Sequence, residues 1–337
     1  MSEPVRATIV GAGAWGSALA SLLARNGHDV LIWSYEDDVA AAINSEHRNP
    51  YLEGVALPEA IRADTDLGAA VEGAALVVSA SPSQFVRRVM AEAAEALEPG
   101  VLLLSATKGI ELGTLLRMDE VLADVLPRAA MESFCVLSGP SFAQEVAAGS
   151  PTAVVIASHD QGAAERARSL FQTSTFRVYT NTDVVGVEIG GALKNVIAIA
   201  AGTTAGLGYG HNTLAALITR GLAEVTRLGL AVGAERATFY GLAGLGDLVL
   251  TCTGSLSRNR TVGYRLGQGE RLEQILSEMS AVAEGVKTTE AARELARRHG
   301  VEMPITEQMY AILYEGRSPD EALRTLMSRD PKPEEWT

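Results

Sequence analysis

Short apolar runs alternate with amphipathic stretches from Ala7 to about Tyr179. The runs occupy residues 7–10, 30–33, 75–78, 102–105, 135–138 and 153–156. They are continuously apolar instead of alternating with polar residues, which indicates strands that are covered on both faces. Amphipathic segments such as 85–97 and 163–171 supply the covering helices. This pattern predicts a doubly wound α/β domain with a parallel sheet.

The strand pattern stops near Asn181, and longer helical patterns follow. Candidate helices occupy residues 183–201, 212–228, 289–298, 306–314 and 320–327, and Thr182 or Asp183 is a suitable N-cap for the first of them. We therefore expect an α/β domain over residues 1–181 and an all-α second domain over 182–337. A length of 337 residues fits two such domains.

The net charge of −13 narrows the choice of partners. A surface with this charge repels nucleic acid and anionic lipid, so we expect no nucleic-acid partner. An anionic substrate would have to meet local positive charge.

The apolar segments and the cysteines indicate the cellular compartment of the protein. The stretch Ile189–Tyr209 is interrupted by Lys194, Asn195 and glycines, so we interpret it as a buried helix and loop. The first residues lack the layout of a secretory signal, and Cys135 and Cys252 are the only cysteines. These features predict a cytoplasmic protein without stable membrane insertion.

A glycine-rich turn, Gly11–Gly16, directly follows the first predicted strand. Gly11 would allow a tight bend, Gly13 would let a ligand approach the backbone, and Gly16 would let the next helix pack closely. The amides at the helix start suit a pyrophosphate. The turn also opens an amphipathic helix that leads to a second strand, as in a Rossmann-type dinucleotide site. An ordinary strand-to-helix turn is the alternative.

The end of the second strand leaves the choice between NAD and NADP open. It reads Trp33-Ser34-Tyr35-Glu36-Asp37, and neither carboxylate is clearly at the position that binds the ribose of NAD. No arginine stands there to hold a 2′-phosphate either.

Lys194 is the only basic residue between Arg177 and His211. Desolvation by its apolar neighbours would lower its pKa toward the range useful in acid–base catalysis. The alternative is a lysine that reaches solvent or pairs with Glu188.

Other polar groups stand where a ligand could meet them. Lys108 follows the strand at 102–105, at the carboxyl end where open α/β sheets bind ligands. Gly139–Ala143 follows another strand, and could be a ligand loop or a simple turn. The glycine-dense segment 241–248, with Asp247, and the block Ser257–Arg260 would suit a phosphate, although Ser257 could equally be an N-cap.

The histidines show no metal-ligand spacing, and the two cysteines are too far apart in sequence for a standard metal motif. We therefore predict no metal site.

Together, Gly11–Gly16, Ala106–Gly109, Ser138–Ala143, Gly190–Val196, Gly244–Leu248 and Ser257–Arg260 resemble the motifs of the bacterial NAD(P)-dependent glycerol-3-phosphate dehydrogenases. The match follows the family's order over nearly the whole chain. The resemblance implies reversible hydride transfer between NAD(P)H and dihydroxyacetone phosphate, with sn-glycerol 3-phosphate as the product for glycerophospholipid synthesis. It also implies a homodimer by analogy.

The same resemblance assigns site residues one by one. Lys194 would transfer the proton and Lys108 would polarise the same oxygen. The implied substrate site comprises Lys108, Gly139, Ser141, Lys194, Asp247, Ser257, Arg258 and Asn259. The implied cofactor site comprises Gly11, Gly13, Ala14, Trp15, Gly16, Tyr35, Lys108, Ala143, Arg258, Val282 and Glu284. Ala14 and Tyr35 depart from the family, which often has serine at the first position and a basic residue or histidine at the second.

Two alternatives remain. A 3-hydroxyacid or ketopantoate-type reductase would share the glycine turn and a lysine on the first helix of the second domain, but not the Ser257–Asn259 block. A non-catalytic redox sensor would bind the nucleotide but has no need of an isolated lysine in an apolar helix.

Overall fold

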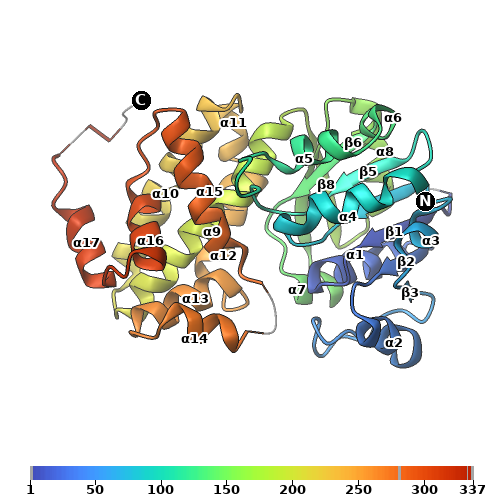
Figure 1. The fold of residues 1–337 in the computed structure, drawn as a ribbon, viewed down its shortest axis with the longest axis horizontal. Helices are drawn as coiled ribbons and strands as arrows, with labels where there is room; N and C mark the ends of the chain where they lie inside the picture. Colours follow the sequence, from blue (N-terminus) through green and yellow to red (C-terminus); the bar gives the residue numbers. More distant parts are fainter. Residues whose placement is uncertain (1–2, 280–281, 332, 335–337) are drawn as a thin grey trace.

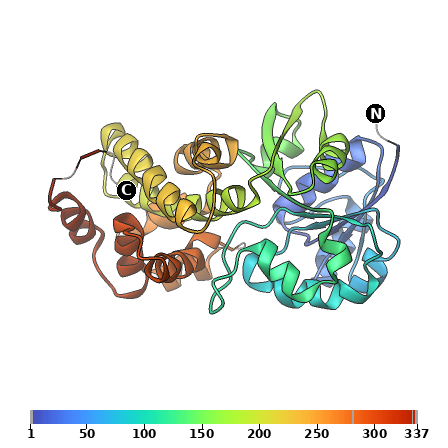
Figure 2. The same ribbon diagram turned by 90° about the horizontal axis from the view of Figure 1, so that it is seen from above.

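A computed structural model describes residues 3–279, 282–331 and 333–334. The chain forms two lobes, one built on a sheet and one built of helices (Figure 1). The sheet lobe contains the N-terminus, and the helical lobe contains the last helices of the chain. A view from above shows the same separation into two halves, joined where α9 (Val184–Gly206) leaves the sheet lobe (Figure 2).

The sheet lobe is built on eight strands in the order β3-β2-β1-β4-β5-β6-β7-β8. Their bounds are β1 (Arg6–Val10), β2 (Asp29–Trp33), β3 (Arg62–Asp64), β4 (Leu76–Ser79), β5 (Leu102–Ser105), β6 (Phe134–Ser138), β7 (Thr152–Ala157) and β8 (Phe176–Asn181). Strand order reverses between β1 and β4, and the crevice at such a switch point is where doubly wound sheets bind ligands. The doubly wound fold predicted from the sequence is confirmed.

The prediction of a wholly parallel sheet is wrong at β7. Strands β1 to β6 pair in parallel, but β7 is antiparallel to β6 and parallel to β8. Only a short loop and α7 (Ala143–Ala147) join β6 to β7, so no helix carries the chain back along the sheet, as a parallel crossover requires.

Two strands were not predicted. The three residues of β3 include two charged ones, and β8 alternates buried with exposed positions because it is the edge strand. A search for continuous apolar runs misses both.

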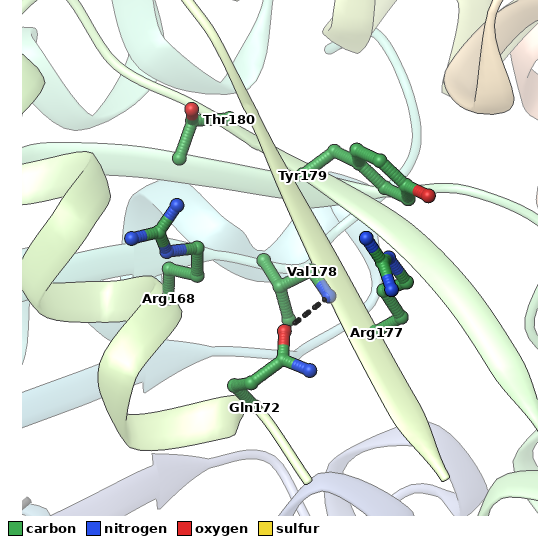
Figure 3. Close-up of a pocket in the computed structure, with 6 residues that line it drawn as sticks. All are labelled: Arg168, Gln172, Arg177, Val178, Tyr179 and Thr180. Carbon is green, nitrogen blue, oxygen red and sulfur yellow. Dashed lines mark hydrogen bonds between the residues drawn. The ribbon is translucent and has the colours of Figure 1, made fainter. Parts of the chain in front are cut away.

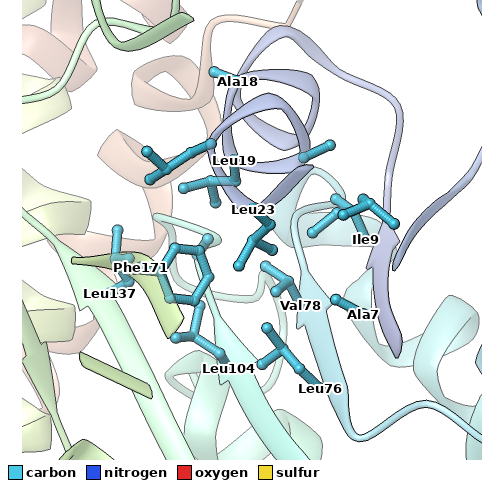
Figure 4. Close-up of a cluster of buried hydrophobic side chains, with 14 of the residues drawn as sticks. Ala7, Ile9, Ala18, Leu19, Leu23, Leu76, Val78, Leu104, Leu137 and Phe171 are labelled. Carbon is cyan, nitrogen blue, oxygen red and sulfur yellow. The ribbon is translucent and has the colours of Figure 1, made fainter. Parts of the chain in front are cut away.

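Helices cover the sheet on both faces. On one face, α1 (Ala14–Arg25) packs Ala18, Leu19 and Leu23 against Ile9 and Val78, all without exposed surface (Figure 4). Burial of each large side chain contributes about 1.5–3 kcal/mol. The other helices of this lobe are α2 (Asp37–Glu46), α3 (Leu67–Val71), α4 (Val86–Ala93), α5 (Met118–Val125), α6 (Arg128–Met131) and α8 (Gln161–Phe171).

The helical lobe surrounds α9. Asp183 caps this helix by accepting a hydrogen bond from the Gly186 amide at 2.8 Å, as one of the two predicted caps. The helices around it are α10 (His211–Ala231), α11 (Arg236–Phe239), the π-helical turn η3 (Leu242–Gly246), α12 (Asp247–Thr253), α13 (Arg258–Gly267), α14 (Leu272–Ser277), α15 (Glu284–Arg298), α16 (Pro304–Tyr314) and α17 (Pro319–Met327). All five predicted helices of this half are present, although α9 continues to Gly206.

Among the described residues, α9 is the one unbroken helix long and apolar enough to cross a membrane by length and composition. Of its most apolar window, 94% is buried inside the protein. The prediction of a buried helix is therefore confirmed, and α9 forms the core of this lobe.

Glycines allow α9 and α13 to touch backbone to backbone. Gly202 and Gly206 on α9 meet Gly263 and Gly267 on α13, and a Cβ atom added at any of the four would overlap backbone atoms of the other helix. Such spacing of small residues lets helix axes approach unusually closely, and a side chain there would force the helices apart. The crossing fixes α13, whose first turn carries Arg258 and Asn259, against α9.

Candidate active site

The glycine turn has the geometry that the sequence predicts. Gly11 has φ +126°, and a Cβ there would lie 2.8 Å from the Ala80 carbonyl carbon and the Ser81 nitrogen. A Cβ at Gly16 would overlap the Gly11 carbonyl oxygen. By contrast, nothing lies within 4 Å of a Cβ added at Gly13. Two glycines therefore form the turn, and the third leaves space above it.

The start of α1 offers free backbone donors beside this space. Gly13 is the N-cap and has no side chain to accept hydrogen bonds, and the first amide to bond Gly13 is that of Ser17 at 3.0 Å. The amides of Ala14, Trp15 and Gly16 precede it, in the turn that lacks intrahelical acceptors. These donors and the positive end of the helix fit the pyrophosphate of a dinucleotide.

Two lysines share one buried carboxylate at the junction of the lobes. Lys194 on α9 donates to Asp247 Oδ1 at 2.5 Å, and Lys108 after β5 donates to Asp247 Oδ2 at 2.6 Å. Asp247 is 1% exposed and is the first residue of α12. Three separate segments thus concentrate two positive charges and one negative charge in a protein with a strongly negative net charge.

This arrangement shifts the pKa values of the cluster. Burial lowers the pKa of Lys194 to about 8; Asp247 opposes the shift and Lys108 adds to it. Burial alone would raise the pKa of Asp247, but the two ammonium groups hold it below its ordinary value. A lysine with a pKa near 8 can both give and take a proton near neutral pH.

The alternative partner for Lys194, Glu188, is engaged elsewhere. Its carboxylate accepts from the Asp119 amide at 3.0 Å and lies 3.4 Å from the Arg117 guanidinium. Lys194 is 8% exposed, and its ammonium group binds Asp247 and Thr251 instead of extending to the surface. The structural alternatives weighed for this lysine are therefore absent from the structure.

Thr251 belongs to the cluster and was not predicted. Its hydroxyl accepts from Lys194 at 2.9 Å and donates to the Asp247 carbonyl at 2.6 Å. Thr251 follows Asp247 by four residues on α12, so both side chains lie on one helix face. That spacing is the signal that could have identified it.

The loop after β6 contacts the same cluster. Lys108 also donates to the Gly139 carbonyl at 3.3 Å, and Ser141 donates to that oxygen at 3.0 Å. Gly139 has φ +136°, and a Cβ there would lie 2.9 Å from Val154 Cα. The loop is therefore held against both β7 and Lys108. These contacts favour a ligand loop over a simple turn.

The start of α13 lies beside Asn195, the residue that follows Lys194 on α9. Asn259 donates to Asn195 Oδ1 at 3.0 Å and accepts from the Gly285 amide at 2.9 Å. Ser257 is the N-cap of α13 and accepts from the Arg260 amide at 3.2 Å. The N-cap alternative for Ser257 is thus present, and its hydroxyl proton is left to donate elsewhere.

Glu284 connects the two lobes. It begins α15 and accepts from the amide and the hydroxyl of Ser83, at 3.0 and 2.5 Å. Burial raises the pKa of Glu284, while Ser83 and the charge of nearby Arg258 lower it. Neither Asn195 nor Ser83 was predicted, because their partners are distant in sequence.

The remaining predicted residues lie around this centre with fewer contacts. The half-buried Trp15 has a ring nitrogen without a hydrogen-bond partner, and Ala143 begins α7. Val282 is 49% exposed before α15, and Tyr35 is 71% exposed after β2. Among the described residues, none of these four forms a hydrogen bond or ion pair with Lys108 or Lys194.

A hollow on the outer side of β8 lies apart from this chemistry. It is lined by Arg168, Gln172, Arg177, Val178, Tyr179 and Thr180 (Figure 3). Gln172 accepts from the Val178 amide at 2.9 Å, so its side chain supports the edge strand. Neither active-site lysine lines this hollow.

The described residues contain no group of three or more histidine, cysteine or acidic side chains that could hold a metal ion. Both cysteines are buried and unpaired, and burial raises their pKa values, to about 11 for Cys135 and about 12 for Cys252. Neither is a ready nucleophile.

A doubly wound sheet with this glycine turn, facing a helical lobe that presents a buried lysine, defines a nicotinamide-dinucleotide-dependent dehydrogenase. Two family models match the chain: the NAD-dependent glycerol-3-phosphate dehydrogenase N-terminus over residues 6–164, and its C-terminus over 183–324. The chain belongs to the NAD-dependent glycerol-3-phosphate dehydrogenase family.

Individual relatives agree with this assignment. Glycerol-3-phosphate dehydrogenase [NAD(P)+] of Geobacter sulfurreducens is 58% identical over 337 residues, covering 100% of both chains. The crystal structure of a glycerol-3-phosphate dehydrogenase from Coxiella burnetii has a TM-score of 0.92 at 40% identity, covering 97% of this chain and 99% of that one.

The alternative reductase class shares the fold. A ketopantoate reductase from Ralstonia eutropha JMP134 has a TM-score of 0.58 at 17% identity, covering 94% of this chain and 99% of that one. This likeness is one of fold alone.

Proposed function

We propose that this protein catalyses the reversible NAD(P)-dependent interconversion of dihydroxyacetone phosphate and sn-glycerol 3-phosphate, and that it supplies glycerol 3-phosphate for glycerophospholipid synthesis. The observation that carries this proposal is the cluster of Lys108, Asp247 and Lys194, which places a proton donor of lowered pKa in a buried ionic cluster where the two lobes meet. Family membership supports the substrate.

The dinucleotide supplies or accepts the hydride when it is bound. Lys194 protonates the ketone oxygen during reduction and removes the hydroxyl proton in the reverse direction. Lys108 polarises the same oxygen with its ammonium group, and Asp247 holds both lysine side chains in place. The hydrogen bond from Lys194 to the Thr251 hydroxyl helps to fix the orientation of the Lys194 ammonium group.

In this proposal the substrate phosphate lies at the start of α13, which carries Ser257 and Arg258. Arg258 would bind the substrate phosphate and approach the cofactor, since a guanidinium matches phosphate geometry. The further substrate groups are Gly139, Ser141, Ser257 and Asn259. The proposed cofactor groups are Gly11, Gly13, Ala14, Trp15, Gly16, Tyr35, Lys108, Ala143, Val282 and Glu284.

The proposed domain division follows the same functional split. We assign residues 1–181 to the cofactor domain and 182–337 to the substrate domain, because β8 ends at Asn181 and α9 begins at Val184. We further propose a cytoplasmic homodimer that inserts into no membrane and binds no nucleic acid, in keeping with the net charge of −13.

The test follows the oxidation of NADH and NADPH with dihydroxyacetone phosphate for the wild type and for Lys194→Met. Loss of the proton donor should lower kcat roughly 10²–10⁴-fold and leave dinucleotide binding intact. In the wild type, ketone reduction should fall above pH 8, because Lys194, with its pKa lowered to about 8, then loses its proton. This pH dependence should be absent from the variant.

Leu193→Met is the matched control, because it places methionine at a neighbouring buried position of α9 with little change in volume. It should retain near-wild-type activity. An unchanged rate in Lys194→Met would remove the lysine from the mechanism. Equal rates with dihydroxyacetone phosphate and unphosphorylated dihydroxyacetone would refute the substrate, and a preference for ketopantoate would favour the alternative reductase class.

A further inference from the structure

An arginine lies where the sequence offered none, beside the end of β2. The Arg88 guanidinium carbon, on α4, is 5.8 Å from the centre of the Tyr35 ring and 5.6 Å from that of Phe85. Tyr35 is 71% exposed and Phe85 is 47% exposed. Arg88 therefore lies over two accessible aromatic rings that come from segments far apart in the sequence.

Both of these segments border the glycine turn. The Gly11 amide donates to the Trp33 carbonyl at 3.1 Å, which fixes the end of β2 beside the turn. On the other side, the tight approach of Gly11 to Ala80 and Ser81 fixes the start of the loop that leads to Phe85. Tyr35 and Arg88 thus lie close to the glycine turn, next to the site proposed for the pyrophosphate.

Arg88 carries a charge that no acid neutralises among the residues that the structure describes. Its neighbour Arg87 differs, because it binds Glu111 at 2.9 Å and Asp124 at 3.2 Å. No ion pair or hydrogen bond is formed by Arg88 within the described ranges, 3–279, 282–331 and 333–334. The guanidinium retains its donors for a ligand.

The carboxylate that would favour NAD is missing from its usual place. Ser34 follows the last residue of β2, is buried, and donates to the Glu36 carbonyl at 2.9 Å. The Glu36 carboxylate itself accepts from the Tyr51 hydroxyl at 3.2 Å. In doubly wound folds an acid at the end of β2 binds the ribose of NAD, whereas an arginine there accommodates the 2′-phosphate of NADP.

We propose that Arg88 binds the 2′-phosphate of NADP(H) and makes NADPH the preferred cofactor of this chain. The proposal rests on the dinucleotide site proposed above. The planar guanidinium can donate two parallel hydrogen bonds to a phosphate, and the rings of Tyr35 and Phe85 hold it at the mouth of the crevice. Sequence order hid this residue, because it lies after β4, on the other side of β1.

The test measures binding without turnover. NADPH and NADH are titrated against the wild type and Arg88→Gln by fluorescence transfer from tryptophan to the reduced nicotinamide. Adenosine 2′,5′-bisphosphate and ADP are titrated by calorimetry. Arg88→Gln should weaken NADPH and the 2′,5′-bisphosphate on the order of 10–100-fold, the range for losing charge-assisted hydrogen bonds, with NADH and ADP changed less than about threefold. The NADPH affinity of Arg88→Lys should lie between those of the wild type and Arg88→Gln, because lysine keeps the positive charge but cannot donate two parallel hydrogen bonds to one phosphate.

Arg177→Gln is the matched control. Arg177 lies 5.2 Å from the centre of the Tyr179 ring on β8, at the opposite edge of the sheet, so it reproduces the exposed arginine–tyrosine pair away from the crevice (Figure 3). It should leave all four affinities unchanged. Tighter wild-type binding of NADH than of NADPH, or equal losses for both in Arg88→Gln, would overturn the proposal. Failure of every dinucleotide to bind the wild type would instead overturn the proposed function.

Discussion

The two lobes use glycine in opposite ways. In the sheet lobe, Gly13 faces open space at the start of α1 and leaves backbone amides uncovered. In the helical lobe, Gly202 and Gly263 face each other's helix, and their missing side chains are replaced by protein backbone. Gly13 leaves the start of α1 open to a ligand, whereas Gly202 and Gly263 allow α9 and α13 to pack in direct backbone contact.

Charge is divided between the lobes in a similar way. The turn that we assign to the cofactor offers backbone dipoles, whereas the helical lobe supplies Asp247 and Lys194 to a buried ionic cluster and takes Lys108 from the sheet lobe. Binding in the first lobe thus depends on an exposed backbone, and chemistry at the junction depends on desolvated charge. Substitutions that change dinucleotide binding without changing the reaction rate, or the rate without changing binding, test this difference between the lobes.

Among the substitutions that test this comparison between the lobes, the largest effect is expected from Asp247→Asn. Without the carboxylate, the two ammonium groups repel each other unopposed, and the pKa of Lys194 should fall further, by roughly 1–3 units for loss of a close opposite charge. From a pKa of about 8, the protonated fraction at pH 7.5, and with it the rate of ketone reduction, should drop between about threefold and about 200-fold. The pH profile of kcat measures this, and the decline above pH 8 should move to lower pH.

Dinucleotide affinity is the control for Asp247→Asn, because the glycine turn is untouched. If the rate falls without any displacement of the pH profile, Asp247 positions substrate and does not set the pKa of Lys194.

A smaller effect, on stability, is expected from Gly263→Ala. The added methyl group would overlap the Ile199 carbonyl on α9, and relief requires the helices to separate. Overpacking of this kind costs about 1–3 kcal/mol of unfolding free energy. Urea unfolding measures this loss of stability. An unchanged urea midpoint would show that α9 and α13 can separate to accommodate the methyl group at little cost.

The smallest effect on stability is expected from Gly13→Ala. A Cβ there meets no atom, so the cost should stay within about 1 kcal/mol, the range for replacing an N-cap glycine. The methyl group would instead occupy the space proposed for the pyrophosphate and weaken NADPH binding. Titration of NADPH beside urea unfolding checks this, and tight binding by the variant would place the pyrophosphate elsewhere.

The sequence predicts the fold where burial is continuous. Strands such as β4 and β5 are apolar at nearly every position because helices cover both faces, and they were located within one or two residues. Edge strand β8 alternates, and β3 has the sequence Arg-Ala-Asp, so neither carries that signal. The antiparallel β7 has the same pattern as its parallel neighbours, because periodicity reports burial and not direction.

The candidate site divides in the same manner. Lys194 is conspicuous as an isolated charge in an apolar segment, and burial lowers its pKa in the direction predicted. Thr251 and Asn195 are ordinary helix residues, and the contact of Thr251 with Lys194 and that of Asn195 with Asn259 exist only after α12 and α13 pack against α9. Arg88 was invisible beside Tyr35 because the chain passes through β3 and β4 before it returns.

The distance of Lys194 from the first turn of α9 makes the position of its ammonium group sensitive to the direction of the helix axis. Lys194 is ten residues from the start of the helix at Val184, which places it about 15 Å along the axis. Asp183 holds the start of the helix in place, because it accepts hydrogen bonds from the Gly186 amide, the Glu235 amide and the Thr238 hydroxyl, at 2.8, 2.9 and 2.6 Å. A rotation of about 10° there would sweep the lysine through roughly 2.6 Å on that arm. The hydrogen bonds of Asp183 at the start of α9 thus help to fix the position of an ammonium group ten residues farther along the helix.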